Sequence, residues 1–179
     1  MLSDDNLFKV IAINVVIFLF WNLIVCCACK MLGNEYFDYK KYMYKIKYWE
    51  DKGNLYNKWL KIKAWKDRLP QYISKNGFSK KNFNSLSLEY IDRFILETCR
   101  AEWAHRNCIL IVFLMILINK FVTGLIFSLI VMFIHFPYIC IQRYNRIRLI
   151  KIREKILKSK KDNYEKEKII KFVKKFKLS

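Results

Sequence analysis

The stretch ETCRAEWAHRNCI, residues 97–109, carries Glu97, Arg100, Glu102 and His105 at helical spacing. Glu102 and His105 are three residues apart, so on a helix their side chains lie within contact. A carboxylate beside an imidazole orients the ring and makes it more basic, as in many general bases. Glu97 and Arg100 have the same spacing and predict a second pair on a neighbouring edge. The pattern predicts acid–base chemistry, with His105 as the base and Glu102 as its orienting partner.

A second polar cluster lies in PYICIQRYNRIRL, residues 137–149. It provides amide and guanidinium side chains: Gln142, Arg143, Asn145 and Arg146. The apolar runs between the two clusters are separated only by Asn119 and Lys120, which predicts a tight antiparallel helical hairpin. Positions equidistant from the turn then lie at equal depth, which puts His105 level with His135. We therefore expect the two clusters to meet in one layer.

Three apolar runs of membrane-spanning length hold these clusters. They cover residues 10–29, 101–118 and 121–141, and about 20 helical residues match the roughly 30 Å hydrocarbon core of a bilayer. The expected fold is an all-α integral membrane protein with about three transmembrane helices plus interfacial amphipathic helices. Lys and Arg are dense in residues 30–106 and after 142. The positive-inside rule then predicts a multi-pass cell-membrane protein with its N-terminus outside and its C-terminus in the cytoplasm.

A single membrane domain with four segments is expected. Residues 1–30 form the first span, 31–87 a cytosolic and interfacial aromatic-basic segment, 88–148 a helix and the hairpin, and 149–179 a basic amphipathic tail. Ser87 is the expected N-cap of the helix that runs into the second span. The apolar side chains of the tail recur at helical spacing: Ile169, Phe172, Val173 and Phe176. This pattern predicts a solvated or membrane-skimming helix.

The net charge of +19 limits the partners. On a soluble fold it would favour nucleic acid, but beside apolar blocks it favours anionic lipid headgroups, and no nucleic-acid partner is expected. Six cysteines and two histidines lack the spacing of a zinc site, so no metal is expected. A structural ion-pair network stays open as an alternative, because arginines flanking a span are ordinary topology signals. Glu97 and Glu102 are not explained that way, since acids contribute little to orientation and are costly near hydrocarbon.

Three strings together resemble one known family. They are GNLYNKWLKIKAWKDRLP at residues 53–70, ETCRAEWAH at 97–105 and PYICIQRYNRIRL at 137–149. They resemble the glycosyl-4,4'-diaponeurosporenoate acyltransferase family, whose members complete the staphylococcal carotenoid staphyloxanthin. Ile147 stands where the family pattern has proline, and this departure leaves the carotenoid acceptor open.

The resemblance implies a membrane enzyme that moves a fatty acyl group onto a hydroxyl of a glycosylated lipid. It needs no cofactor beyond its acyl donor, which is acyl-CoA, an acyl carrier protein or a lipid. Thirteen positions match the family strings, and Thr98 and Tyr144 are two of them. The other eleven are the candidate site: Trp65, Lys66, Asp67, Glu97, Arg100, Glu102, His105, Gln142, Arg143, Asn145 and Arg146.

Acyl transfer to a hydroxyl needs a base for the acceptor proton and a donor for the oxyanion. His105 is the expected base, oriented by Glu102, and Glu97 positions Arg100 or Arg143. Substrate binding falls to the remaining candidates: Arg143, Asn145 and Arg146 for the donor's phosphates or the oxyanion, Gln142 beside them, and Trp65, Lys66 and Asp67 for the acceptor sugar. Two other classes stay open, a non-enzymatic scaffold or partner subunit and a membrane transferase that acts on another lipid.

Overall fold

The structure, a computed structural model, describes residues 6–69 and 87–177, with side chains described up to residue 166. Residues 70–86 of the predicted aromatic-basic segment lie outside this description, and so do the apolar side chains predicted for the tail: Ile169, Phe172, Val173 and Phe176. The described residues are helical or irregular and contain no strand.

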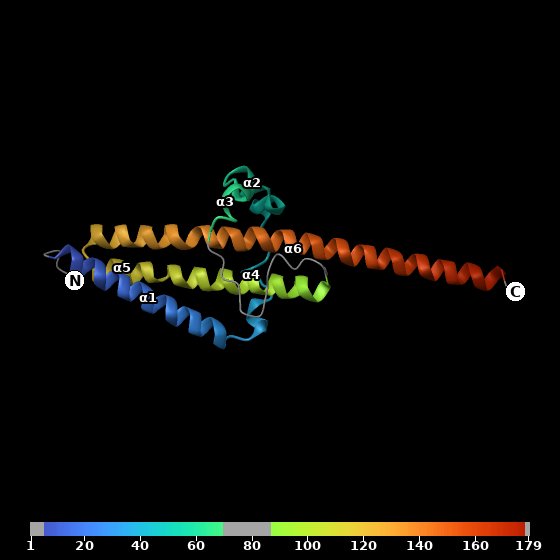
Figure 1. Cartoon of the computed structure of the whole chain (residues 1–179), viewed down its shortest axis with the longest axis horizontal. Coiled ribbons are helices and arrows are strands. Elements are labelled where there is room, and N and C mark those ends of the chain that lie inside the picture. The colour runs from blue at the N-terminus through green and yellow to red at the C-terminus, as the bar shows by residue number, and fades with distance from the viewer. Residues whose placement is uncertain (1–5, 70–86, 178–179) are drawn as a thin grey trace.

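Three long helical units form the body of the protein. They are α1 (Leu7–Met31), α4 (Leu88–Ile109) continued by α5 (Ile111–Ile118), and α6 (Phe121–Lys177). The α4–α5 unit runs beside α6 in the opposite direction, and α1 crosses them at an angle (Figure 1). All three units are long and apolar enough to cross a membrane. The predicted all-α fold with three spans is therefore confirmed.

Contacts at the hairpin turn fix the positions of α1, α5 and α6 relative to one another. Asn14 of α1 and Asn119 at the turn are buried and exchange two side-chain hydrogen bonds of 2.9 and 2.8 Å. Just beyond the turn, a Cβ on Gly124 would lie 2.7 Å from the carbonyl oxygen of Met115. Only glycine lets α5 and α6 approach this closely. The turn therefore fixes which residues of the two legs face each other.

The second span differs from the predicted continuous helix at Leu110. Its N–H bonds to the carbonyl of Asn107 at 3.1 Å, which makes a single 3₁₀ turn between α4 and α5. The indole of Trp21 on α1 donates to the same carbonyl at 3.0 Å, so this acceptor is shared with a neighbouring helix. The start of α4 is as predicted, because Ser87 Oγ accepts a hydrogen bond of 3.1 Å from the N–H of Tyr90.

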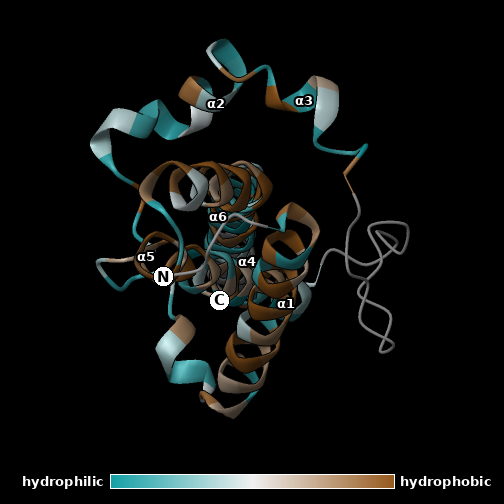
Figure 2. Cartoon of the chain, turned by 90° about the vertical axis from the view of Figure 1, so that its left-hand side faces the viewer, coloured by the Kyte–Doolittle hydropathy of each residue, from teal (hydrophilic) through white to brown (hydrophobic). Residues whose placement is uncertain are grey.

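The described part of the segment between α1 and α4 forms several short helices. They are η1 (Asn34–Phe37), η2 (Tyr48–Gly53), α2 (Asn54–Lys58) and α3 (Ile62–Trp65). The α2–α3 part arches over α6 (Figure 2) and buries Tyr56 and Ile62 against it. Other rings of the segment are exposed, as an interfacial location requires: Tyr36, Tyr42, Tyr48, Trp49 and Trp59.

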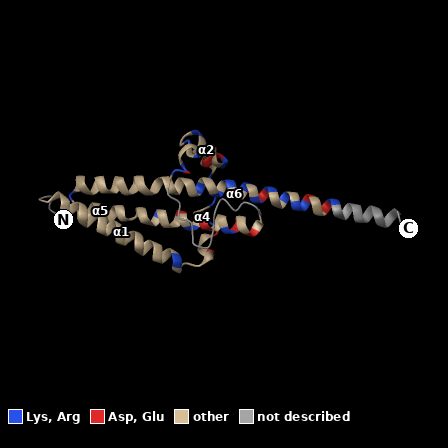
Figure 3. Ribbon diagram, in the orientation of Figure 1, with Lys and Arg blue, Asp and Glu red and all other residues tan. Residues whose placement is uncertain are grey.

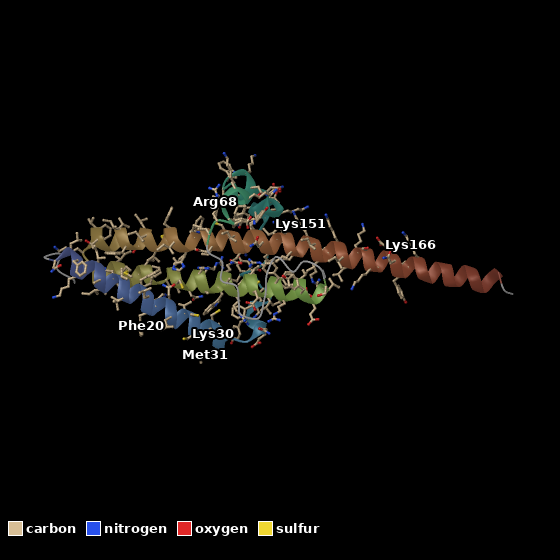
Figure 4. The ribbon with its side chains drawn as sticks, in the orientation of Figure 1. Phe20, Lys30, Met31, Arg68, Lys151 and Lys166 are labelled. Carbon is tan, nitrogen blue, oxygen red and sulfur yellow. The ribbon has the colours of Figure 1, made fainter. Side chains whose placement is uncertain are left out.

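The tail is the continuation of the hairpin's second leg. α6 passes Pro137 and extends as one helix to Lys177, well beyond the other helices (Figure 1). Its first part is apolar, and charged residues begin at Arg143 and recur along the rest of the described helix (Figure 3). Lys151, near the root of the tail, donates to the carbonyl of Lys52 at 2.7 Å, whereas Lys166 stands on the projecting part (Figure 4). The tail therefore continues the axis of the third apolar helix instead of forming a separate helix.

Candidate active site

Glu102 lies at the centre of a buried ion-pair network between α4 and α6. Its carboxylate is fully buried and accepts hydrogen bonds from two arginines of α6, Arg143 at 2.9 Å and Arg146. Arg106, one turn further along α4, approaches at 3.2 Å. The predicted pairing of Glu102 with His105 is therefore wrong, because guanidinium groups take both carboxylate oxygens. The two predicted clusters do meet, through Glu102 and the arginines.

Arg143 uses all five of its N–H donors inside the protein. Nε and one Nη2 proton bind the two oxygens of Glu50 at 2.8 and 2.7 Å, and Nη1 binds Glu102. The remaining two protons go to the backbone carbonyls of Met43 and Lys45. Because all five N–H groups are used, Arg143 has none with which to bind a donor phosphate. It instead connects the segment before α4 to the hairpin. Arg146 is equally buried, at 1% exposure.

Glu50 stays charged within this network. Burial alone raises the pKa of a carboxyl, but hydrogen bonds from Arg143, the Lys47 N–H and the Tyr56 hydroxyl together hold the pKa of Glu50 below its usual 4.5. Burial and the 2.6 Å hydrogen bond to Glu50 raise the pKa of Tyr56, so this hydroxyl remains a donor. Two buried carboxylates thus balance two buried guanidiniums, which is the condition under which such charges are tolerated away from water.

His105 faces α6 and lies against His135 and Tyr138. The Nδ1 atoms of the two histidines are 3.1 Å apart, and the ring of Tyr138 stacks on that of His105 with 4.8 Å between centroids and 10° between planes. Phe18 of α1 covers His135, with ring centroids 5.8 Å apart. His135 is buried, whereas His105 is half-buried. The predicted equal depth of the two histidines is confirmed.

Polar side chains continue from the histidines along one face of α6. Tyr138, Gln142 and Asn145 follow His135 at spacings of three and four residues, which places them in one stripe. All three are half-buried, and Gln142 and Asn145 make no hydrogen bond within the described part of the chain. We call these four residues together with His105 the histidine track. Measured from the hairpin turn, His135 lies about 22 Å and Gln142 about 33 Å along the helix. In a hydrocarbon core of about 30 Å that begins at the turn, the track would lead from inside the core to its edge.

Glu97 and Arg100 lie on another face of α4. They form the predicted ion pair, at 3.4 Å, and Arg100 also donates to Asn34 of η1 at 2.7 Å. Together with Glu89, Asp92, Arg93 and Leu96 they line an open groove of about 750 Å³. Arg100 and His105 are about 140° apart around the helix. The structure therefore does not bring Glu97 or Arg100 to the imidazole.

The three candidates at the end of the first family string are also remote from the histidine track. Trp65 donates its indole N–H to the carbonyl of Leu60 at 2.7 Å, and Lys66 pairs with Asp67 at 2.7 Å. Trp65 packs on the cluster around Tyr144, which is about 180° from His135 around α6. Trp65 therefore covers the opposite side of that helix.

Sequence reasoning missed three side chains of this region: Glu50, His135 and Tyr138. His135 had been placed level with His105 without a role, and Tyr138 follows it by one helical turn. The register of the hairpin could therefore have pointed to both residues as neighbours of His105. Glu50 had no such signal, because only the fold of the segment after α1 brings it to Arg143.

Comparison of the sequence with known proteins identifies a family. The profile of the glycosyl-4,4'-diaponeurosporenoate acyltransferase family matches residues 40–155. This chain belongs to that family. The protein of that name from Staphylococcus aureus strain MRSA252 is 30% identical over 138 residues, which cover 75% of this chain and 81% of the relative. The protein from strain Newman has the same identity and coverage, and that from strain N315 is 29% identical. No solved structure matches significantly.

Membership makes the chain an acyltransferase. The residues that match the family profile include the whole ion-pair network and the whole histidine track of this acyltransferase. Phe18 on α1 lies outside the matched range. The shared part is thus the hairpin with the segment that Arg143 anchors to it.

Proposed function

We propose that this membrane protein transfers a fatty acyl group to a sugar hydroxyl of a glycosylated lipid, with His105 as the general base. The relatives are named for glycosyl-4,4'-diaponeurosporenoate as acceptor, and we propose a carotenoid glycoside of this class for this chain too. The observation that carries the proposal is the state of His105. Its imidazole is half-buried and its Nε2 has no hydrogen-bond partner among the described residues, so this nitrogen is free to meet a substrate hydroxyl.

The reaction balances with one proton moving through His105. Nε2 takes the proton of the acceptor hydroxyl as the hydroxyl oxygen bonds to the donor's acyl carbon. The resulting tetrahedral oxyanion needs a hydrogen-bond donor, and the phenol of Tyr138, stacked on His105, is the hydroxyl beside the base. The bond from the acyl carbon to the donor's sulfur or oxygen then breaks, and Nε2 returns the proton to that leaving group. The donor is a thioester, as in acyl-CoA or an acyl carrier protein, or a lipid ester.

The rest of the track and the exposed charges suit the polar parts of the substrates. Gln142 and Asn145 have unused amide donors and acceptors at the edge of the hydrocarbon, where a sugar attached to a membrane-embedded tail would lie. Arg148 and Lys151 are exposed one to two turns further along, where they attract the phosphates of a donor or of anionic lipids. We place this end of the bundle in the cytoplasm, because the Lys and Arg side chains gather there (Figure 3).

Purified enzyme in a defined lipid mixture tests the base. We expect His105→Ala to lower the rate of acyl transfer about 100-fold or more, which is the usual contribution of a general base. Glu89→Gln is the control, because Glu89 begins the same helix but lines the remote groove. Transfer by His105→Ala at the wild-type rate would refute the assignment.

A further inference from the structure

We propose that His135 is a positioning residue that fixes the tautomer of His105. This proposal rests on the proposed role of His105 as the base. Nδ1 of His135 accepts the hydrogen bond that the Nδ1–H of His105 donates. This arrangement leaves Nε2 of His105 unprotonated and directed to the acceptor hydroxyl. It gives His135 the role that the sequence pattern assigned to Glu102.

The distance between the two rings limits the protons they hold. With their Nδ1 atoms 3.1 Å apart, the histidines have room for one proton between these atoms. A neutral imidazole carries one N–H and one lone pair. If the shared proton belongs to His105, its Nε2 is a base and His135 carries its own proton on Nε2. If the proton belongs to His135, Nε2 of His105 is a donor and cannot accept the substrate's proton.

The surroundings confine the positive charge to His105 during the reaction. Nε2 of His135 is buried and has no hydrogen-bond partner in the described chain, and Phe18 lies against that ring. A cation on His135 would therefore be buried without an acceptor, which is strongly unfavourable. His105 is half-buried and reaches the hydroxyl. When it takes the substrate proton on Nε2, its Nδ1–H remains bonded to the neutral His135.

The buried nitrogen of His135 gives the second reason for a specific role. A phenylalanine of similar shape would fill this place without leaving a polar atom unsatisfied, and an unsatisfied buried group is destabilising. No other side chain in the described residues reaches Nδ1 of His105. Glu102, the carboxylate at the expected spacing, is held by three arginines. His135 is thus the partner that determines the orientation of the base.

Nitrogen-15 NMR of the intact protein in detergent micelles tests the tautomers without any activity assay. The chain has two histidines, so selective labelling gives signals from these two rings alone, and His135→Asn assigns them by leaving His105. We expect His105 to be protonated on Nδ1 and His135 on Nε2 at neutral pH. A wild-type spectrum with His105 protonated on Nε2 overturns the proposal.

Kinetics of two His135 variants then test the consequence. The carboxamide oxygen of His135→Asn lies near the place of Nδ1 and keeps an acceptor, whereas His135→Phe keeps the ring and removes it. We expect His135→Phe to lower kcat about 10- to 100-fold with KM unchanged, and His135→Asn to recover most of the rate. Equal rates for the two variants overturn the proposal. If the wild type itself transfers no acyl group, the proposed function fails, while the NMR result still decides the pairing.

Discussion

Removal of the Arg143 guanidinium is the sharpest perturbation of the architecture. Arg143→Met keeps much of the side chain's length and takes away five hydrogen bonds at once. Two carboxylates, both with 0% of their side chains exposed, lose a charge partner. Glu102 retains Arg146, but the only donors left to Glu50 in the described chain are the Tyr56 hydroxyl and one backbone N–H.

The expected loss follows from these burials. Breaking a buried ion pair from one side costs about 3–5 kcal/mol, most of it from the charge that is left behind. We expect Arg143→Met to lower the free energy of unfolding by about this amount. Arg148→Met, one turn along the same helix, removes an exposed arginine that lies over the ring of Tyr144 at 5.6 Å. That control should cost about 1 kcal/mol or less.

Unfolding in mixed micelles with increasing sodium dodecyl sulfate, followed by circular dichroism, measures both variants. Glu50→Gln is the second mutation of a double-mutant cycle, because it removes the carboxylate charge that Arg143→Met leaves without a partner. Combined with Arg143→Met it should cost less than the sum of the two single changes. The reasoning would be refuted if Arg143→Met were no more destabilising than Arg148→Met, or if the two losses were simply additive.

Three further predictions concern single features of the structure. The pKa of Glu50 is held below its usual 4.5, so its contribution to stability is present above that value and is lost as pH falls through the lower, folded-state pKa. Unfolding measured at a series of pH values should show this loss in the wild type and less of it in Glu50→Gln. Equal pH profiles for the two proteins would contradict the prediction. Burial, with Cys99 and Glu102 nearby, raises the pKa of Tyr44 to about 12, so ultraviolet titration should show a late-ionising tyrosine that is missing in Tyr44→Phe, with stability declining between pH 10 and 12. Gly124→Ala should destabilise the hairpin by about 1–3 kcal/mol, since the added Cβ meets backbone atoms. Gly33→Ala is the control, because its Cβ meets only the movable carboxylate of Glu35. Equal losses of unfolding free energy in the two variants would contradict the close approach of α5 and α6.

The hairpin and its register could be read from the sequence because they depend on local signals. Two apolar runs with only Asn119 and Lys120 between them leave no alternative to antiparallel legs. The same counting put His105 opposite His135, and their Nδ1 atoms are 3.1 Å apart. Ser87 likewise caps α4 through a hydrogen bond within three residues.

The partners of the charged residues could not be read in this way. Helical spacing puts Glu102 within reach of His105, but it does not show that two arginines of α6 compete for the same carboxylate. Glu50 reaches Arg143 across 93 residues of sequence, through a segment whose course no periodicity predicts. The faces of the helices were equally hidden, so Glu97 and Arg100 were grouped with an imidazole that points elsewhere.

Lipid analysis by mass spectrometry shows whether this chain adds a fatty acyl group to a glycosylated carotenoid and whether His105 is required. Cells that make a glycosylated carotenoid would receive this acyltransferase, its His105→Ala variant at matched membrane abundance, or neither. We expect a product heavier by one fatty acyl ester in cells with the wild type alone, and unmodified glycoside in the other two. An acyl ester formed equally by His105→Ala, or none formed by the wild type, would contradict it.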